Sequence, residues 1–337
     1  MSTRILVNPS TKKNMTLNEF IKQWCDESDV IEVQTSGSTG TPKKMMVEKA
    51  RMRASARITC RFLGLQEGDT ALLCMPLDYI AGKMMVVRSL ECGLRLIAVE
   101  PSSHPLKDID AIPTFAAMVP LQVAKSLEIP EEAERLRQIS HLIIGGGAID
   151  EALETKLRTM PNAIWSTYGM TETLSHIALR RISGSEASLW YTPLDSVSIS
   201  TDADGCLIVD APKVCSQRLT TNDIAIMDAE GRRFRIVGRR DNVICSGGIK
   251  IQMEEVERLL KPHINCQFVI TKRHDPLLGE AVTLLYEGEA SLKEKIEDAC
   301  RGILPRHWHP RYIMSIDRIP MTETGKPARA RIAQMVN

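Results

Sequence analysis

A short loop rich in glycine and hydroxyl side chains is the strongest candidate for chemistry in this sequence. It runs from Gln34 to Lys43 and directly follows a predicted strand at residues 30–33. Glycines allow backbone N–H groups to approach a ligand, hydroxyls donate hydrogen bonds and a lysine supplies positive charge. The loop therefore predicts a cradle for phosphate oxygens, formed by Thr35, Ser36, Gly37, Ser38, Thr39, Gly40 and Lys43.

The loop is not a Walker phosphate-binding loop, because Pro42 stands where that motif requires glycine. A solvated turn of glycine, serine and threonine is the ordinary alternative for such a stretch.

Two more turns of this kind follow predicted strands. Gly146, Gly147 and Ala148 come after a buried strand at residues 141–144, and they suit either a flat ligand or a plain strand-to-helix turn. The segment 166–173 ends the next strand, where ligands bind in open α/β sheets. Its candidates are Tyr168 for packing on a base, Gly169 and Thr171 beside it, and Glu172 for Mg²⁺ on ATP phosphates. A carboxylate at a helix start is the alternative for Glu172.

Three weaker candidates lie further along the chain. Asp223, in the segment 220–223, suits the two hydroxyls of a ribose, although that segment alone predicts a turn. Arg239 and Asp241 belong to Gly-Arg-Arg-Asp at 238–241. Lys326 ends a loop rich in glycine and threonine, where a lone lysine is ordinarily a solvated charge.

The elements that must position these residues change in type along the chain, as the pattern of apolar residues changes. Up to about residue 167, apolar strands alternate with helices, as in an α/β domain. The expected strands are 30–33, 71–75, 94–99, 115–119, 141–144 and 163–167, and the expected helices are 47–63, 80–91 and 151–158. Gly64 and Gly93 fall where helices should end.

A β-rich subdomain is expected from about residue 188 to 237, with hairpin signals at Asp204-Gly205 and Glu230-Gly231. Beyond it we expect a small α+β domain. Its predicted elements are helices 253–261 and 292–301 and strands 267–271, 281–286 and 311–316. The chain is therefore divided into a large N-terminal α/β domain, 1–240, and a small C-terminal domain, 241–337.

Composition excludes several classes of protein. The chain has 337 residues and a formal net charge of +1, which gives no indication of a nucleic-acid partner. Its nine cysteines form no metal-ligand spacing and suit a reducing compartment. The first residues show no apolar run long enough for a signal peptide or a membrane span, so a cytoplasmic protein is expected.

The motifs, in this order, resemble those of the adenylate-forming superfamily of acyl- and aryl-CoA synthetases, luciferases and adenylation domains. The matching stretches are T-S-G-S-T-G-T-P-K, G-G-G-A, Y-G-M-T-E-T, T-N-D, G-R-R-D, S-G-G-I-K and P-M-T-E-T-G-K, spanning residues 34 to 326. The resemblance implies an enzyme that uses ATP and Mg²⁺ to convert a carboxylic acid to an acyl-adenylate, with coenzyme A as the co-substrate. Family precedent allows monomers and homodimers.

The resemblance also implies roles for single residues. Residues 35–40 and Lys43 match the loop for the β- and γ-phosphates. Gly146, Gly147, Ala148 and Tyr168 match the adenine wall, and Thr171 and Glu172 match the phosphate and Mg²⁺ positions. Asp223 and Arg239 match the ribose contacts, and Asp241 matches a hinge of the mobile small domain. Lys326 matches the catalytic lysine that contacts the substrate carboxylate and the α-phosphate.

The front of the chain departs from the family, since only 33 residues precede Gln34. Short members of this shape resemble o-succinylbenzoate–CoA ligases of menaquinone biosynthesis. The segment 76–84 matches the acyl-pocket motif, with Tyr79 where that motif has a histidine. The second carboxylate of such a diacid must be desolvated, which is costly without a cation. Lys83 is our candidate partner, with Arg88 five residues later, and a side chain that only reaches solvent is the alternative.

Three functions remain open from the sequence. The first is an acid–CoA ligase acting on o-succinylbenzoate. The second is an adenylating enzyme that loads a carrier protein, and formation of a thioester with coenzyme A alone would separate the two. The third is a nucleotide-binding regulator without chemistry, against which the presence of both Glu172 and Lys326 argues.

Overall fold

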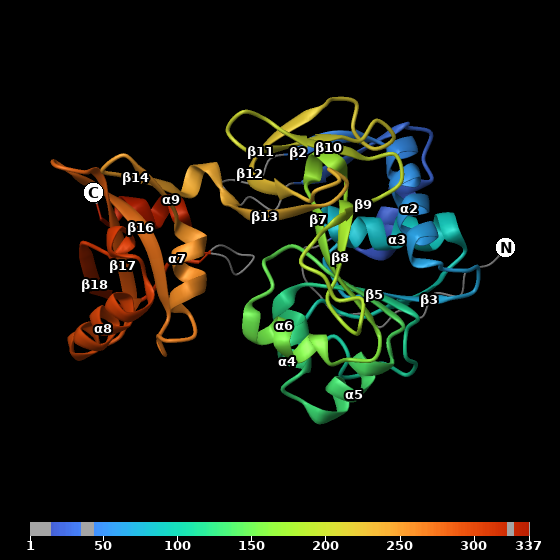
Figure 1. The fold of residues 1–337 in the computed structure, drawn as a ribbon. Coiled ribbons are helices and arrows are strands. Elements are labelled where there is room, and N and C mark those ends of the chain that lie inside the picture. Colours follow the sequence, from blue (N-terminus) through green and yellow to red (C-terminus); the bar gives the residue numbers. More distant parts are fainter. Residues whose placement is uncertain (1–14, 35–43, 322–326, 337) are drawn as a thin grey trace. The chain divides into compact units, whose positions relative to one another are not determined.

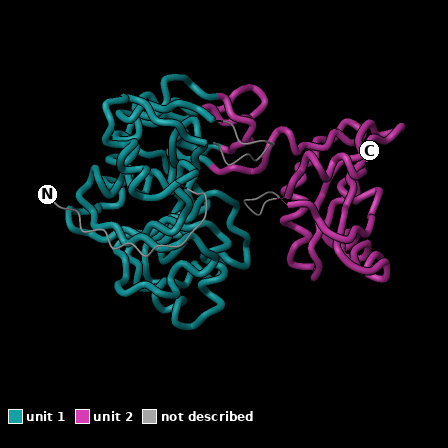
Figure 2. Tube along the Cα trace, turned by 180° about the vertical axis from the view of Figure 1, so that it is seen from behind, with its two compact units in different colours: residues 1–199, 209–219, 227–234 teal, residues 200–208, 220–226, 235–337 magenta. Residues whose placement is uncertain are grey.

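The computed structural model of this chain describes residues 15–34, 44–321 and 327–336. Its residues group into two compact units, shown in Figure 2. Unit 1 comprises residues 1–199, 209–219 and 227–234, and unit 2 comprises 200–208, 220–226 and 235–337. The sequence-based division at residue 240 stays a prediction.

Unit 1 begins with a helix and a hairpin. Helix α1 (Leu17–Trp24) starts at a capping box in which Thr16 and Glu19 satisfy each other's backbone N–H groups. Strands β1 (Val30–Gln34) and β2 (Lys44–Glu48) then pair antiparallel. The expectation that residues 47 and 48 begin a helix is wrong, because both pair with β1 and the helix starts at Lys49.

The next two helices end at the two glycines that were expected to end them. Helix α2 (Lys49–Leu63) stops at Gly64 and helix α3 (Ile80–Cys92) stops at Gly93. Both glycines have the left-handed backbone conformation, with φ of 68° and 66°, which residues other than glycine rarely adopt. The C-terminal ends expected from the sequence are therefore confirmed to within one residue.

A seven-stranded sheet is the centre of unit 1 and confirms the α/β prediction. Its order is β4-β3-β5-β6-β7-β8-β9; the first five strands are parallel, and β8 and β9 are antiparallel to their neighbours. The strands are β3 (Thr70–Leu73), β4 (Arg95–Ala98), β5 (Phe115–Met118), β6 (His141–Ile144), β7 (Ala163–Gly169), β8 (His176–Arg181) and β9 (Thr192–Pro193). The chain order reverses between β3 and β5, and ligands bind at such reversals, beyond the carboxyl ends of the strands.

Helices cover both faces of this sheet (Figure 1). Helices α2 and α3 lie on one side, and α4 (Pro120–Ser126), α5 (Pro130–Gln138) and α6 (Glu151–Arg158) lie on the other. On the second side Leu72 and Ile144 of the strands pack with Leu136 of α5 and Leu157 of α6 in one buried cluster. Burial of this apolar surface holds the layers together and fixes the strand ends where the candidate residues lie.

A four-stranded sheet confirms the expected β-rich segment, and residues of its strands fall in both units. Its order is β10 (Ser198–Thr201), β11 (Cys206–Asp210), β12 (Leu219–Met227) and β13 (Phe234–Arg239). Gly205 and Gly231 have positive φ at the two predicted hairpins. The turn expected at residues 220–223 is wrong, because strand pairing on both sides of β12 outweighs the local preference for a turn.

The C-terminal part of unit 2 has the expected α+β character. Strands β15 (Ile249–Gln252), β14 (Val243–Ser246), β17 (Gly279–Glu287) and β16 (Phe268–Asp275) lie in this order, and β18 (Tyr312–Ile316) runs parallel to β17. Its helices are α7 (Met253–Leu260), α8 (Lys293–Ile303), α9 (Arg329–Gln334) and the single turns η3 (Ala290–Leu292) and η4 (Arg306–Trp308). The apolar spacing of helix 253–261 places Met253, Val256, Leu259 and Leu260 on one face; in α7 the first two and Leu260 are buried, and Leu259 is partly buried. None of the helices in the described residues is both long and apolar enough to cross a membrane.

Candidate active site

Two of the predicted nucleotide-binding turns lie at the same edge of the seven-stranded sheet. Strands β6 and β7 are parallel, with Ile144 opposite Ser166, so the turn containing Gly146, Gly147 and Ala148 begins beside the end of β7. A Cβ at Gly145 would lie 2.4 Å from Thr167 Oγ1, which is closer than any real contact. Glycine is therefore needed here for the two turns to pack together.

Thr171 and Glu172 lie in a single helical turn, η1 (Thr171–Thr173), directly after β7. The buried Thr173 hydroxyl fixes this turn: it accepts from the Met170 N–H at 3.1 Å and contacts the Ser175 carbonyl oxygen at 2.8 Å. Glu172 is exposed on the resulting turn. The chain then returns so closely that a Cβ at Gly169 would lie 2.3 Å from the Ser175 carbonyl oxygen.

Tyr168 belongs to an aromatic cluster that the sequence did not indicate. Its ring centroid lies 5.1 Å from that of Phe234 and 5.9 Å from that of Tyr191. Backbone hydrogen bonds join Tyr191 to Phe234, and the Tyr191 hydroxyl lies 2.7 Å from Ser166 Oγ. The rings come from segments far apart in the chain, so no local spacing could have found them.

The candidates at Asp223, Arg239 and Asp241 form one charged cluster within unit 2. Arg239 donates from Nη1 to Asp223 Oδ1 at 3.2 Å and from Nη2 to Asp241 Oδ2 at 3.1 Å. Asn222 also donates to Asp241, at 3.2 Å, and Asp241 lies in the turn η2 (Arg240–Asn242). Strands β12 and β13 are neighbours in the four-stranded sheet, which brings these residues together across the sequence.

The predicted acyl-pocket segment forms the start of helix α3. Tyr79 precedes the helix and its backbone bridges to Gln34, the last residue of β1. Lys83 is only 3% exposed, and its Nζ donates to the Glu32 carbonyl oxygen at 2.6 Å. The alternative that Lys83 reaches solvent is therefore wrong. Burial lowers the pKa of its amine, so the charged form is less favoured than on a surface.

Arg88, one turn further along α3, is buried, which the sequence did not indicate. It is 2% exposed, and its Nη2 donates to Ser175 Oγ at 2.6 Å. Its Nη1 meets only the Met85 sulfur at 3.7 Å, and its buried Nε has no partner among the described residues. Burial lowers the pKa of this guanidinium to about 10, which still leaves it charged at neutral pH. No described carboxylate pairs with it.

The predicted phosphate loop, with Thr35, Ser36, Gly37, Ser38, Thr39, Gly40 and Lys43, lies outside the described residues, as does Lys326. The described residues on either side of the loop are paired, since Gln34 of β1 lies opposite Lys44 of β2. Lys44 Nζ also lies 2.8 Å from Glu32 Oε1. Gln34 and Lys44, the described residues that flank the predicted loop, are thus paired in a regular hairpin ladder.

The described residues fit a Mg²⁺ ion that arrives with ATP better than a permanent metal centre. Among them, no three His, Cys, Asp or Glu side chains gather at one point. Mg²⁺ is ordinarily held by one or two carboxylates together with substrate phosphates and water. The exposed carboxylate of Glu172 can supply such a ligand at the edge where the two turns meet.

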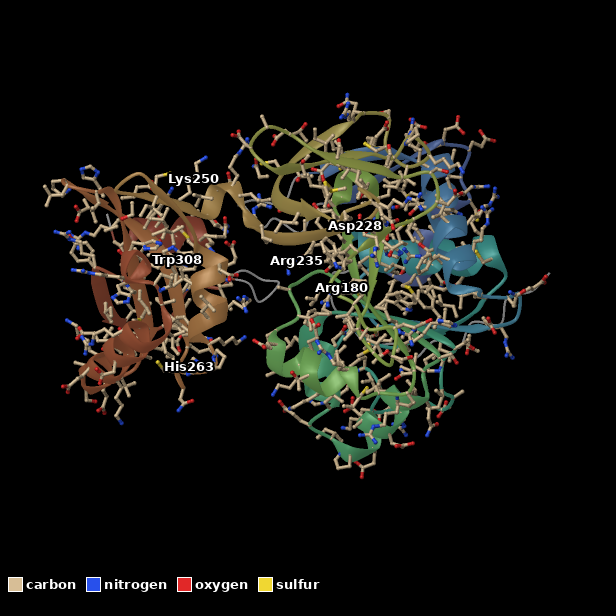
Figure 3. The ribbon with its side chains drawn as sticks, in the orientation of Figure 1. Arg180, Asp228, Arg235, Lys250, His263 and Trp308 are labelled. Carbon is tan, nitrogen blue, oxygen red and sulfur yellow. The ribbon has the colours of Figure 1, made fainter. Side chains whose placement is uncertain are left out.

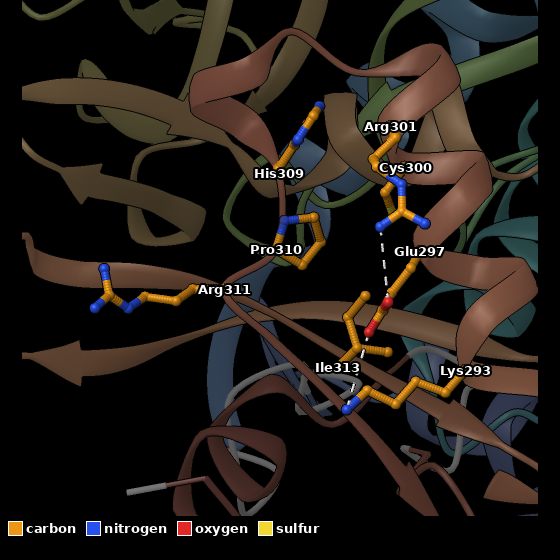
Figure 4. A pocket seen from close by; sticks show the side chains of 8 residues that line it. All are labelled: Lys293, Glu297, Cys300, Arg301, His309, Pro310, Arg311 and Ile313. Carbon is orange, nitrogen blue, oxygen red and sulfur yellow. Dashed lines mark ion pairs between the residues drawn. The ribbon is translucent and has the colours of Figure 1, made fainter.

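A hollow of about 240 Å³ in the C-terminal part of unit 2 contains none of the predicted residues (Figure 4). Its charges are paired with one another: Glu297 lies 3.9 Å from Lys293 and 3.8 Å from Arg301. Arg311 on its rim pairs with the buried Asp275 at 2.9 Å. These pairings leave little charge for a ligand, so we do not take this hollow as the active site.

Comparison with known proteins agrees with this geometry. A family model described as AMP-binding enzyme matches residues 6–233. Two curated relatives are named 2-succinylbenzoate–CoA ligase. The one from Bacillus thuringiensis subsp. konkukian is 25% identical and aligns with 90% of this chain and 69% of its own length. The one from Enterococcus faecalis is 26% identical and aligns with 96% and 74%.

Solved structures give the same fold. An acyl-CoA synthetase (AMP-forming)/AMP-acid ligase II-like protein from Dyadobacter fermentans is 31% identical, with a TM-score of 0.64, and covers 95% of this chain and 93% of its own. The o-succinylbenzoate–CoA synthetase of Bacillus subtilis, in complex with the acyl-adenylate intermediate, has a TM-score of 0.75 at 24% identity. It covers 89% of this chain and 68% of its own, and at that identity the likeness establishes the fold alone.

Proposed function

This chain belongs to the AMP-binding enzyme family, and we propose that it is an ATP-dependent acid–CoA ligase whose substrate is o-succinylbenzoate. In the first half-reaction a substrate carboxylate oxygen attacks the α-phosphorus of ATP, and pyrophosphate leaves. In the second half-reaction the thiol of coenzyme A attacks the acyl carbon, and AMP leaves with the bonding electron pair. Menaquinone biosynthesis is the proposed pathway, the cytoplasm the proposed location, and a monomer or homodimer the proposed state.

The first half-reaction brings two anions into contact, so positive charge and hydrogen-bond donors must offset the repulsion. Lys43 and the hydroxyls of the predicted phosphate loop would hold the β- and γ-phosphates, and Glu172 would hold Mg²⁺. When bound, Mg²⁺ neutralises charge on the phosphate oxygens. Lys326 would contact the attacking carboxylate and the α-phosphate, while Asp223 and Arg239 would bind the ribose.

Arg88 is the observation that supports a diacid. A buried guanidinium is costly to desolvate, and a folded protein ordinarily offsets that cost with a carboxylate. Arg88 has one hydroxyl and one thioether as partners, and its Nε–H has none among the described residues. It lies on α3, whose first turns match the acyl-pocket motif. The second carboxylate of o-succinylbenzoate is an anion of the right chemistry for this charge.

Lys83, the partner that we inferred from the sequence, is a weaker candidate for this carboxylate. Its amine already donates to the Glu32 carbonyl oxygen, and that bond joins α3 to the strand preceding the phosphate loop. An amine committed to a backbone carbonyl has fewer N–H groups free for a ligand than a guanidinium with a single strong acceptor. We therefore propose Arg88 as the principal partner and keep Lys83 as the comparison.

Pyrophosphate exchange across a panel of acids tests the substrate. The panel contains o-succinylbenzoate and two matched mono-acids: benzoylpropionate, which lacks the ring carboxylate, and o-butyrylbenzoate, which lacks the chain carboxylate. We expect exchange to be fastest with o-succinylbenzoate. When coenzyme A is added without any carrier protein, we expect the CoA thioester of o-succinylbenzoate to form. Faster exchange with an aliphatic acid would contradict the substrate, and exchange without a CoA thioester would favour a carrier-protein acceptor.

Arg88→Met tests the carboxylate partner. Losing a charged hydrogen-bond partner costs about 1.5–3 kcal/mol. The ratio of kcat/KM for o-succinylbenzoate to kcat/KM for the reactive mono-acid, meaning whichever of the two mono-acids the enzyme adenylates, should therefore fall by about ten- to a hundredfold. Lys83→Met is the matched control on the same helix. We expect it to affect both acids by similar factors, because its bond to Glu32 supports the site as a whole. A fall in the ratio for Lys83→Met alone would return the role to Lys83.

A further inference from the structure

A chain of hydrogen bonds, partly buried at Ser175 and buried at Thr59, leads away from Arg88 across three elements. Arg88 Nη2 of α3 lies 2.6 Å from Ser175 Oγ, and Ser175 Oγ lies 3.3 Å from His176 Nδ1 at the start of β8. His176 Nε2 lies 3.0 Å from Thr59 Oγ1 of α2. Thr59 Oγ1 in turn donates to the Ser55 carbonyl oxygen one helical turn earlier, at 3.1 Å.

The donors in this chain can be assigned in one direction. Thr59 gives its one hydroxyl proton to Ser55, so it must accept from His176 Nε2–H. A neutral imidazole has one N–H, which leaves Nδ1 to accept from the Ser175 hydroxyl. The Ser175 oxygen then accepts from Arg88. His176 is neutral, because burial and then the Arg88 charge hold its pKa well below the usual range.

Every member of this chain is fixed by packing. Thr59 is fully buried, His176 is 8% exposed, and Arg88 is 2% exposed. Ser175 is held from the other side, because Thr173 Oγ1 contacts its carbonyl oxygen at 2.8 Å and Gly169 packs against the same atom. The position of the Ser175 hydroxyl is therefore fixed by the turn that carries Glu172.

The chain orients Arg88 without neutralising it. The successive acceptors along the chain are the Ser175 hydroxyl, the His176 imidazole and the Thr59 hydroxyl, and none of them carries charge. A carboxylate in the position of Ser175 would fix the guanidinium equally well but would also pair with its charge. The thiols of Cys60 and Cys92 are the other titratable groups that act on Arg88.

We propose that Ser175 and His176 are positioning residues that hold the Arg88 guanidinium in the orientation needed to bind the second carboxylate of the substrate. The inference deepens the proposed function and rests on it. It assigns selectivity for a diacid to three side chains outside the predicted nucleotide-binding motifs, of which only Arg88 touches the substrate.

A double-mutant cycle on the complete chain tests this role. The measured quantity is kcat/KM for o-succinylbenzoate divided by kcat/KM for the reactive mono-acid, in wild type, Ser175→Ala, Arg88→Met and the double variant. We expect Ser175→Ala to lower the ratio by about tenfold, chiefly through KM for the diacid, since a lost hydrogen bond to a charged group is worth about one decade. In the Arg88→Met background the same change should not lower the ratio further.

Two substitutions of His176 separate positioning from packing. His176→Leu removes both ring nitrogens and should lower the ratio as Ser175→Ala does. His176→Gln keeps one acceptor for Ser175 and one donor for Thr59, so it should restore most of the ratio.

The outcomes distinguish this inference from the proposed function. If Arg88→Met lowers the ratio and Ser175→Ala does not, the positioning role is wrong and the diacid assignment stands. If Ser175→Ala lowers the ratio equally with and without Arg88, the effect is structural and the inference is again wrong. If Arg88→Met leaves the ratio unchanged, the carboxylate is bound elsewhere and both fail.

Discussion

Two buried arginines of unit 1 are held in opposite ways. Arg180 of β8, labelled in Figure 3, donates from both terminal nitrogens to Glu154 of α6, at 2.8 and 2.7 Å, and lies over the Tyr191 ring. These hydrogen bonds hold the pKa of the Glu154 carboxyl below its usual range. Arg88 is more deeply buried, at 2% exposed against 8%, and has no carboxylate partner among the described residues.

The difference supports a structural role for Arg180. In unit 2, Arg329 of α9 follows the pattern of Arg180, since it pairs with Glu257 of α7 at 2.7 Å. A paired arginine has its charge balanced inside the protein, and the pair joins two elements of the fold. An arginine oriented only by neutral groups keeps its charge for a ligand, and this supports the binding role that we propose for Arg88.

The largest expected effect comes from breaking the Arg180 pair. Glu154→Ala leaves a buried guanidinium without its counter-ion, which ordinarily costs about 3–5 kcal/mol of unfolding free energy. Urea denaturation should show a lower midpoint with an unchanged m value. Glu151→Ala is the matched control, because Glu151 is an exposed carboxylate on the same helix. A loss for Glu154→Ala no greater than that of the control would mean that the Arg180 pair is not structural.

A smaller effect should appear in the pH dependence of stability. His176 has a folded-state pKa well below 6.5, owing to burial and then to Arg88. Below about pH 6.5 the unfolded chain therefore binds a proton at His176 that the folded chain does not bind. The contribution of His176 to stability is complete above that pH and is lost as the pH falls, by about 1.4 kcal/mol per pH unit.

His176→Gln isolates this contribution because glutamine does not titrate. Between about pH 7.5 and about pH 5, the unfolding free energy of wild type should fall by about 2 kcal/mol more than that of the variant. Parallel curves would show that His176 takes up its proton over the same pH range in the folded and the unfolded chain, which would contradict a neutral imidazole in the folded protein below about pH 6.5.

The smallest effect on stability is expected for Arg88→Met. Replacing a buried charge that has no counter-ion with an apolar side chain of similar length is ordinarily neutral or stabilising, so the change should stay within about 1 kcal/mol. The same variant should lose its preference for a diacid. A loss of stability as large as that of Glu154→Ala would make Arg88 structural and would remove the contrast between the two arginines.

The sequence by itself determined many of the elements of unit 1 and their order, although α1, α4, α5 and β8 were not among those expected. Strands β6 and β7, helix α6 and the glycine ends of α2 and α3 follow from apolar spacing and from backbone preferences within a few residues. The order of the glycine-rich motifs indicated the family for the same reason, since each motif is a local pattern. Even the errors were local: β2 and the segment 220–223 were misassigned because pairing with distant strands outweighed their own preferences.

Only the tertiary structure decided which side chains meet. Arg88 and Ser175 are 87 residues apart, and Thr59 and His176 are 117 apart, so no spacing along the chain relates them. Tyr168, Tyr191 and Phe234 come together in the same way. Whether an arginine is balanced by a carboxylate depends on how helices pack on the sheet, because packing determines which groups lose water together. That physical fact separates Arg88 from Arg180, and the sequence treats the two alike.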